Sequence, residues 1–503
     1  MVDTYLYSYA GILAGTLWWY ILENRDKATT YAKSLFFLSA LSYLVLLPLS
    51  DRSLMSKAFW FSRDLGFFLC TVLIGHYLSR NTMIFSAAVV GLLVMLKMVY
   101  LPALPALDPR GELLFDIKQH SQLQQIQRTL SPYRVKITRA FPDLKYPAYS
   151  ELDDFYVVDI PDSKRRKLPR IIQRLYDTGA VDAVEHNEQI QLTPIASDGS
   201  NIYSGSSERE KKLLEKLNDL RAQAQWALLP LEVGSLHQQY KKEIKSPKKK
   251  AKIAILDTGV DSKHEDLKAV YTSTDPKYDS DKQGHGTHCA GIAGALTHNQ
   301  LGIASMIPSH KYVTITSIKV LSDQGGGTQK GIIDGMIRAA DTGADVLSMS
   351  LGGPSSDDRQ RAYEEAIKYV NKSGAIVVAA AGNSNADASR YLPAGAKGVI
   401  AVAAVDAELK KAGFSNRVDG VEMGLAAPGV NILSALPGNG YQENSGTSMA
   451  APFVASVIGL MKAIQPKLTS KEAYQILKKT GKSIPDSKET GPLIQPLKAL
   501  KSM

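Results

Sequence analysis

Residues 251–259 read Ala-Lys-Ile-Ala-Ile-Leu-Asp-Thr-Gly, and this stretch decides the fold. Its largely apolar first part predicts a β-strand. The strand leads directly into Asp257, Thr258 and Gly259, a combination that is common in turns. A carboxylate at the carboxyl end of a parallel strand lies where α/β sheets place their functional sites. Asp257 is therefore a candidate catalytic residue.

Further strand-like stretches follow this one in the C-terminal half of the chain. Residues 344–349, 376–380 and 399–402 are apolar and alternate with helical stretches. This alternation predicts a parallel sheet covered by helices, so the fold class of residues 225–503 is α/β.

The tripeptide Asp-Thr-Gly occurs three times, at Asp177, Asp257 and Asp341. Repeated motifs of this kind raise the alternative of an aspartic protease, in which two carboxylates share a proton. However, Asp177 and Asp341 each follow a helical stretch rather than a strand. We therefore interpret these two motifs as turns that end helices.

Two further motifs carry residues suited to nucleophilic catalysis. Residues 284–288, Gly-His-Gly-Thr-His, place His285 between glycines that let backbone approach closely. The second histidine leaves a metal site as an alternative, although no glutamate-containing zinc motif surrounds the pair. Residues 444–452, Asn-Ser-Gly-Thr-Ser-Met-Ala-Ala-Pro, open an apolar helix. Free N–H groups and the dipole at its start favour negative charge that develops beside Ser448.

At these three motifs the sequence resembles the subtilase family of serine proteases. The motifs stand in the family's order, and the resemblance extends over about residues 225–473. It implies a catalytic triad in which Ser448 attacks the carbonyl, His285 transfers the proton and Asp257 orients the imidazole. It also implies that Asn383 and the Ser448 N–H bind the oxyanion.

The resemblance further implies a substrate cleft with a strand that pairs with the substrate backbone and a pocket wall. Six residues match these two segments: Ser350, Leu351, Gly352, Ala380, Ala381 and Gly382. The catalytic chemistry needs no cofactor. A structural calcium ion is left open, because Asp266 matches a ligand position of the family while the loop at 297–302 is shortened and the other ligands cannot be assembled.

Two cysteines are present, and they are not expected to form a disulfide. Cys70 lies in an apolar N-terminal segment, whereas Cys289 lies four residues after His285 and should share its helix face. We interpret Cys289 as a small core residue. The alternative is a thiol whose modification blocks the histidine.

Residues 1–107 are mostly apolar and carry few charges. Aromatic side chains near the ends of their apolar stretches favour a membrane over a soluble helical core. Lysine and arginine in the first and third loops predict that the protease lies outside the cytoplasm of a multi-pass protein in the cell membrane. The stretches predict a four-helix transmembrane segment: 4–22, 34–50, 65–79 and 82–104.

Residues 108–195 predict a small α+β domain with the element order β-α-β-β-α-β, a ferredoxin-like pattern. Its order and position resemble a subtilase propeptide, which templates folding and inhibits the enzyme with its C-terminal tail. An unrelated recognition or spacer domain is the alternative. If the tail, near residues 189–193, occupies the cleft, self-cleavage should fall between about Gln191 and Gln225.

Residues 196–224 are expected to form a linker and a short helix that Ser207 and Glu210 open with a capping box. The protease domain, residues 225–503, follows. The net charge of the chain is +10, and its densest basic run comprises Lys241, Lys242, Lys245, Lys248, Lys249 and Lys250.

The basic run contains no interleaved aromatic residues, so we interpret it as a solvated linker, with a phosphate- or lipid-binding patch as the alternative. Nucleic acid is not an expected partner. The expected partners are a protein or peptide substrate, membrane lipid and the chain's own propeptide-like domain. The sequence thus predicts a membrane-anchored serine endopeptidase that is made as a zymogen. A receptor or scaffold with silent proteolysis, and a transporter with an attached protease, are the alternatives.

Overall fold

The computed structural model describes residues 111–192, 203–355 and 361–503. The chain divides into two units, residues 1–106 and 107–503, and the described residues belong to the second. The predicted four-helix transmembrane segment lies outside the described residues. Among the residues described, one helix has the length and hydropathy of a membrane span, α12 (Thr447–Ile464), and all of it is buried inside the protein.

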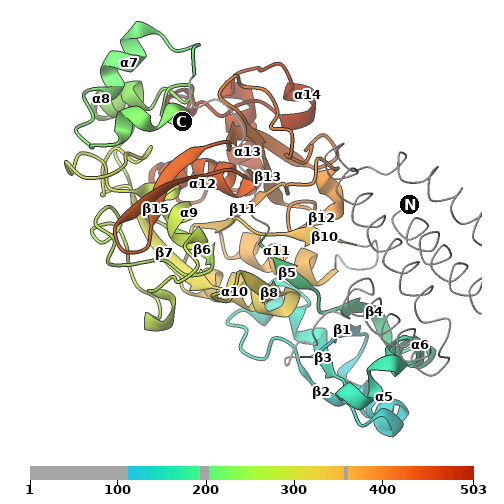
Figure 1. Cartoon of the computed structure of the whole chain (residues 1–503). Helices are drawn as coiled ribbons and strands as arrows, with labels where there is room; N and C mark the ends of the chain where they lie inside the picture. Colours follow the sequence, from blue (N-terminus) through green and yellow to red (C-terminus); the bar gives the residue numbers. More distant parts are fainter. Residues whose placement is uncertain (1–110, 193–202, 356–360) are drawn as a thin grey trace, which may run out of the picture. The chain divides into compact units, whose positions relative to one another are not determined.

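A six-stranded sheet forms the centre of the C-terminal domain, in the order β14-β13-β11-β9-β6-β7 (Figure 1). Each pair of neighbouring strands is parallel, so the predicted parallel sheet is confirmed. The strands have these bounds: β6 Ala251–Asp257, β7 Val313–Lys319, β9 Val346–Met349, β11 Ile376–Ala380, β13 Val399–Val405 and β14 Met423–Pro428.

Helices cover both faces of this sheet. Alternate side chains of each strand point to opposite faces, so each strand packs against both layers of helices. In β6, Ile253 and Ile255 join the hydrophobic cluster that contains α9 (His285–Gly294) and α12. Ala254 and Leu256 join the cluster on the other face, with α10 (Gln329–Asp341) and α11 (Arg361–Lys372). A strand buried on both faces explains why residues 251–257 are apolar almost throughout.

The N-terminal domain, residues 111–192, contains an antiparallel sheet in the order β2-β3-β1-β4. Its elements follow the predicted order: β1 Leu113–Ile117, α5 Leu123–Leu130, β2 Lys136–Arg139, β3 Phe155–Asp159, α6 Leu168–Asp177 and β4 Val181–His186. A 3-10 segment precedes each helix, His120–Gln122 before α5 and Asp162–Lys167 before α6. A further strand, β5 (Gln189–Gln191), was not predicted.

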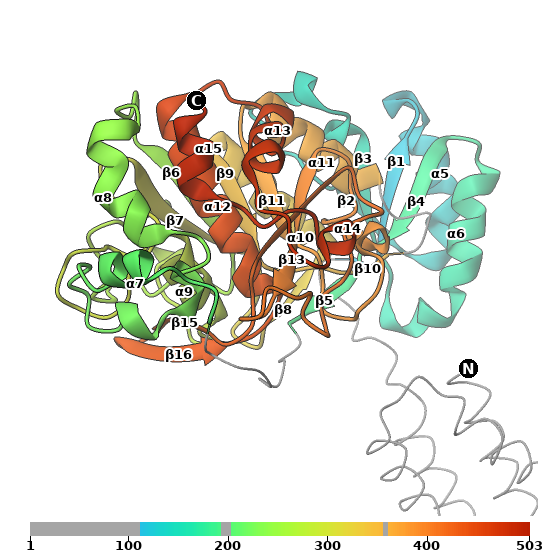
Figure 2. The ribbon, with the colours of Figure 1, turned by 90° about the horizontal axis from the view of Figure 1, so that it is seen from above.

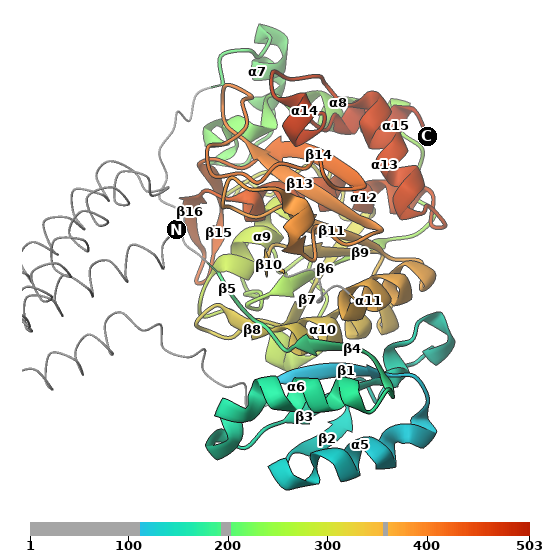
Figure 3. The ribbon, with the colours of Figure 1, turned by 90° about the vertical axis from the view of Figure 1, so that its right-hand side faces the viewer.

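The sheet of the N-terminal domain is also buried on both faces. Leu113 and Phe115 pack under α5 and α6, whereas Leu114, Phe155 and Val157 belong to the same hydrophobic cluster as α10 and α11 of the C-terminal domain. Figures 2 and 3 show the blue and teal domain beside these two helices. The two domains therefore share a hydrophobic core.

Residues 203–243 form two helices that pack on each other, α7 (Glu208–Leu214) and α8 (Val233–Glu243). The Ser207 hydroxyl caps α7 by accepting a hydrogen bond from the Glu210 N–H. The predicted capping box is only half formed, because the buried Glu210 carboxylate accepts hydrogen bonds from the N–H and hydroxyl of Ser235 in α8 instead. The lysines of the basic run are exposed at the end of α8 and beyond it, and Lys249 forms an ion pair with Asp345.

Candidate active site

Asp257 is the last residue of β6, and its side chain is fully buried. The N–H groups of Val320 and Leu321 donate to its backbone carbonyl. The Thr258 N–H donates to its carboxylate Oδ1 at 2.8 Å. The carboxylate is therefore held at the carboxyl edge of the sheet by backbone groups.

His285 is the first residue of α9, and its Nδ1–H faces the Asp257 carboxylate, with both oxygens at 2.9 Å. The start of α9 lies against the turn after β6: a Cβ on Gly286 would lie 2.1 Å from the Gly259 carbonyl oxygen. Only glycine at 286 permits this approach, which brings His285 to Asp257. Burial lowers the pKa of His285, but the Asp257 carboxylate and Cys289 outweigh it and raise that pKa well above its ordinary value.

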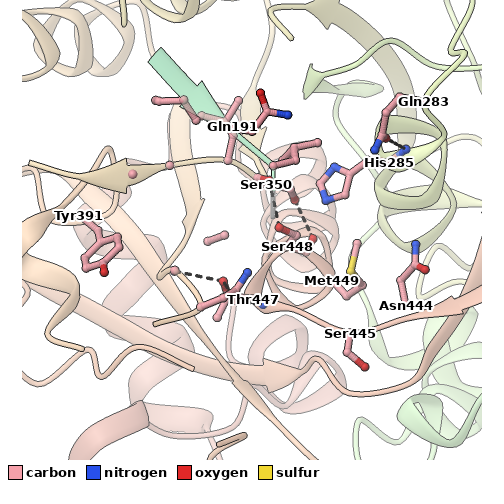
Figure 4. Close-up of a pocket in the computed structure, with 18 of the residues that line it drawn as sticks. Gln191, Gln283, His285, Ser350, Tyr391, Asn444, Ser445, Thr447, Ser448 and Met449 are labelled. Carbon is pink, nitrogen blue, oxygen red and sulfur yellow. Dashed lines mark hydrogen bonds between the residues drawn. The ribbon is translucent and has the colours of Figure 1, made fainter. Parts of the chain in front are cut away.

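Ser448 is the second residue of α12 and lines the same cleft as His285 (Figure 4). Its hydroxyl donates to the carbonyl oxygen of Ser350 at 3.1 Å rather than to the imidazole. The Ser350 hydroxyl in turn donates to the Ser448 carbonyl at 2.7 Å. Hydrogen bonds between catalytic groups are often formed only in the substrate complex, so this geometry suits a resting nucleophile.

Asn383 follows β11 and contacts the residue before the serine. The side-chain oxygen of Asn383 accepts hydrogen bonds from the N–H of Thr447 at 2.9 Å and from its hydroxyl at 2.8 Å. The Thr447 hydroxyl also accepts from the Gly382 N–H at 3.1 Å. Because its oxygen is occupied, the Asn383 amide is oriented, and its NH2 end is left as a donor at the cleft.

The cleft has a volume of about 540 Å³, and its lining includes residues at the carboxyl ends of β9 and β11 and at the start of α12. Five of the six predicted substrate-binding residues line it: Ser350, Leu351, Gly352, Ala380 and Gly382. Ala381 does not, because its side chain is fully buried in the core beneath the cleft.

The lining also contains residues besides the triad, Asn383 and the six predicted substrate-binding residues. The tail of the N-terminal domain, Gln189–Leu192, lies in the cleft, and β5 pairs with β8 (Gly326–Thr328) in antiparallel register. Figure 4 shows Gln191 on its teal strand above Ser448. Gln283, Tyr391 and Asn444 also line the cleft. Gln283 stands in no motif, whereas Asn444 opens the motif at 444–452 and the sequence already points to a tail at 189–193.

The structure also places the residues that suggested an aspartic protease, a metal site or a reactive thiol. Asp177 and Asp341 are the last residues of α6 and α10, so they end helices as expected. His288 donates from Nε2 to the Gln442 carbonyl at 3.0 Å, apart from His285. Cys289 is buried, with its sulfur 3.9 Å from His285 Nδ1 and 3.5 Å from the Ser448 carbonyl oxygen. Burial raises the pKa of this thiol.

The surroundings of Asp266 do not fit a calcium ion. Its carboxylate accepts hydrogen bonds from the Asn299 side-chain amide, the Ile303 N–H and the Tyr441 hydroxyl, at 2.7, 2.8 and 2.8 Å. Calcium is bound by oxygen ligands, whereas these three groups present hydrogen to the carboxylate. The guanidinium of Arg221 also stacks on the Tyr441 ring.

The fold and the site together define a serine endopeptidase of the subtilisin type. The family model "Subtilase family" matches residues 248–493. Subtilisin DY from Bacillus licheniformis is 39% identical over 242 residues, which cover 47% of this chain and 85% of the relative. Thermitase from Thermoactinomyces vulgaris is 43% identical over 216 residues, 42% of this chain and 74% of the relative. The major intracellular serine protease of Bacillus subtilis (strain 168) is 39% identical over 252 residues, 46% of this chain and 76% of the relative. The chain belongs to the subtilase family.

Proposed function

We propose that this protein is a membrane-anchored endopeptidase that is made as a zymogen and processes itself. Ser448 is the nucleophile, His285 the general base and acid, and Asp257 the residue that orients the imidazole. The observation that carries the proposal is the pairing of His285 Nδ1 with Asp257, in the cleft that Ser448 lines.

In the proposed mechanism, Ser448 Oγ leaves the Ser350 carbonyl and attacks the carbonyl carbon of the substrate. His285 accepts the hydroxyl proton and the Asp257 carboxylate stabilises the resulting imidazolium. The oxyanion receives hydrogen bonds from the Asn383 NH2 group and the Ser448 N–H at the start of α12. His285 then protonates the leaving amine, and water hydrolyses the acyl-enzyme.

The position of the tail supports inhibition by the N-terminal domain. The Leu192 N–H donates to the Gly325 carbonyl at 3.0 Å, and the Gln191 side chain donates to the Gln324 carbonyl at 2.7 Å. An added strand of this kind is a common way to bind an extended peptide. The tail, which lines the cleft together with His285 and Ser448, thus takes up space that a substrate would need.

Hydrogen bonds at the starts of two helices of the protease domain support specific docking of the N-terminal domain. The Gln329 and Lys330 N–H groups at the start of α10 donate to the Glu188 carbonyl and the Asn187 side chain. The Ala362 N–H at the start of α11 donates to the buried Glu185 carboxylate at 3.0 Å. Helix starts have N–H groups without partners in the helix, and here the N-terminal domain supplies acceptors for them.

Anchoring rests on residues 1–107, for which the apolar stretches and the interfacial aromatic residues argue. The basic residues of their loops support a protease domain on the extracytoplasmic side. The protein's partners are then the lipid around this segment and its own N-terminal domain, whose tail lies in the cleft. Peptide segments are its substrates.

The proposal is tested by expressing the wild type and Ser448→Ala in membranes and sequencing the N-terminus of the mature form. We expect the wild type to be cut between residues 193 and 203, because the tail is held on β8 and Tyr203 is buried. Ser448→Ala should stay uncut, whereas Ser384→Ala, another serine in the cleft, should be processed normally. Identical uncut chains for the wild type and Ser448→Ala contradict self-processing.

Labelling of the membrane-bound chain with a fluorophosphonate tests the nucleophile separately. Label on Ser448 is expected in the wild type and none in Ser448→Ala. Turnover of a peptide by Ser448→Ala refutes the assignment of the nucleophile, and a wild type that is never labelled favours the receptor or scaffold.

A further inference from the structure

Asp281 is a buried carboxylate in the loop before α9, outside the triad. Only 6% of the residue is exposed. No salt bridge among the described residues includes it, and the neighbouring Lys282 pairs with Asp323 at 3.2 Å instead. A buried carboxylate needs compensating hydrogen bonds, because burial removes its hydration.

Five donors supply this compensation. Oδ1 accepts from the Gln283 and Gly284 N–H groups at 3.1 and 2.8 Å and from the Thr258 hydroxyl at 2.9 Å. Oδ2 accepts from the N–H and the hydroxyl of Thr287 at 2.9 and 2.7 Å. Both oxygens are therefore engaged, by residues on two different segments of the chain.

One of these segments carries His285. Gly284 and Thr287 flank the histidine at the start of α9, where the first N–H groups have no partner within the helix. Asp281 binds Thr287, Thr258 Oγ1 accepts from the Gly286 N–H at 3.0 Å, and the Gln283 side chain accepts from the His285 N–H at 2.7 Å. The first turn of α9 is thus fixed by groups outside the helix.

The other segment carries Asp257. Thr258 follows the catalytic carboxylate directly and donates its N–H to that carboxylate, while its hydroxyl donates to Asp281. One carboxylate thereby joins the end of β6 to the start of α9. The distance of 2.9 Å between His285 Nδ1 and Asp257 depends on the relative placement of these two segments.

We infer that Asp281 is a positioning residue for the protease reaction: it holds the imidazole of His285 in register with Asp257. The inference rests on the proposed roles of His285 and Asp257. Asp281 acts through both residues and touches neither the substrate nor the reacting atoms.

The test is Asp281→Asn in the full-length chain, purified in detergent. The amide keeps the size of the side chain but offers one acceptor oxygen where the carboxylate offers two, so the bond to Thr287 or those to the Gly284 segment must be lost. We expect kcat to fall by about 100-fold, since a small misplacement of a catalytic group has effects of this size. KM should change much less than kcat, because Asp281 itself does not line the cleft, although its partners Gln283 and Gly284 do. The low-field proton resonance of the His285 Nδ1–H should shift.

Asp275→Asn is the matched control. Asp275 caps a short 3-10 helix in this segment by accepting from the Lys277 N–H at 3.2 Å, and no hydrogen bond within the described part of the chain joins it to the triad segments. This variant should keep the wild-type kcat and the wild-type proton resonance. Thr258→Val removes the link from the other side and should lower kcat, whereas Thr258→Ser keeps the hydroxyl and should restore it. The effects of Asp281→Asn and Thr258→Val should add less than fully, because the two residues share the hydrogen bond between them.

Wild-type kcat together with an unshifted His285 resonance in Asp281→Asn overturns the inference. An Asp281→Asn chain that loses its thermal unfolding transition, while Thr258→Val keeps full kcat, overturns it as well and assigns Asp281 to folding alone. Failure of the fluorophosphonate to label the wild type speaks against the proposed function instead, so the two results are distinguishable.

Discussion

Ser448 and Ser350 exchange hydrogen bonds: each hydroxyl donates to the backbone carbonyl of the other residue, at 3.1 and 2.7 Å. Ser350 follows β9, so this pair ties the start of α12 to the strand that lines the cleft. The nucleophile is held in a resting position by a backbone carbonyl, while the Ser350 hydroxyl holds the first turn of the helix that also presents the Ser448 N–H.

We therefore predict that Ser350→Ala lowers kcat by about fivefold. The variant keeps the carbonyl that accepts from Ser448 Oγ but loses one hydrogen bond to the Ser448 backbone, which is worth about 1 kcal/mol. Steady-state kinetics on a chromogenic peptide measure the change. Ser384→Ala in the same cleft is the control and should keep its rate. An unchanged kcat in Ser350→Ala would show that the helix start needs no such support.

Asn383 tests the oxyanion assignment with two variants. Asn383→Ala should lower kcat by about 100- to 1,000-fold with little change in KM, which is the known effect of removing an oxyanion donor from a subtilisin. Asn383→Asp keeps the oxygen that accepts from Thr447 but replaces the donor with a negative charge. Its kcat should be lower still. A more active Asn383→Asp than Asn383→Ala would mean that Asn383 serves only to hold Thr447.

The pH profile of kcat/KM should report the raised pKa of His285. Burial lowers this pKa, but the Asp257 carboxylate and Cys289 together outweigh burial and raise it well above the ordinary value. Since the base acts in its neutral form, activity should be lost on acidification with a midpoint well above about 6.5, the ordinary value. Asp257→Asn should shift this midpoint downward and lower kcat by about 10⁴-fold. A wild-type midpoint at or below the ordinary value contradicts the prediction.

Docking of the N-terminal domain should be pH-dependent. Burial raises the pKa of Asp116 to about 7, against the ion pair with Arg361, and Asp182, Asp154 and Glu151 add to the rise. Burial also raises the pKa of Glu185, although bonds to Ala362 and Gln329 lower it. A carboxyl whose pKa is higher in the docked state favours docking at low pH, and this contribution is lost as pH rises from its ordinary value toward about 7.

Hydrogen exchange of the β1 amides in Ser448→Ala, corrected for intrinsic rates, measures this docking. Protection should be greater at pH 5 than at pH 8. Asp116→Asn, which cannot ionise, should reduce the difference to the part that Glu185 contributes, and Asp159→Asn, at the end of β3 in the same domain, should leave it intact. Greater protection at the higher pH would reverse the sign and contradict the assignment.

The loop around Asp266 should depend on side-chain hydrogen bonds and not on calcium. Tyr441→Phe removes a hydroxyl that lies 2.8 Å from a carboxylate oxygen of Glu265 and of Asp266 and has one hydrogen to donate to them. The Asp266 oxygen keeps its bond from the Ile303 N–H, so the variant loses one hydrogen bond to a charged group, which is worth about 1.5–3 kcal/mol. Thermal unfolding should therefore occur at a lower temperature in Tyr441→Phe, whereas a chelator should leave the wild-type Tm unchanged. Tyr474→Phe, at another buried tyrosine, is the control. A chelator effect with a neutral Tyr441→Phe contradicts this account.

The parts of the fold that the sequence predicts are those with a strong local pattern. Strand β11 has the predicted bounds, and β6 extends one residue further, to Asp257 itself. Apolar runs and turn residues lie within a few positions of each other, so such elements can be located without knowledge of their neighbours. The positions of the three triad residues could be predicted for the same reason, because each stands in a short motif at the start or end of such an element.

Contacts between distant segments could not be predicted. The strand β8 contains two glycines and one threonine, so it has no apolar alternation, and its partner β5 lies more than a hundred residues earlier. The local sequence predicts that Glu210 completes a capping box. In the structure α8 packs nearby, and the Glu210 carboxylate accepts from the Ser235 hydroxyl of that helix instead. Ala381 lies within a cleft-lining run, yet the backbone direction turns its side chain to the core.

The pairing of the tail with β8 has a consequence for how substrates gain access. The cleft that the tail lines can hold one extended segment at a time, and a tethered tail presents itself at an effective concentration on the order of millimolar. On the proposed function, an intact chain therefore excludes all but very abundant peptides. Cutting the connection turns an intramolecular competition into one that dilution can relieve. Cleavage between the tail and the protease domain, more than any change in the catalytic residues, would then determine when the cleft opens to substrates.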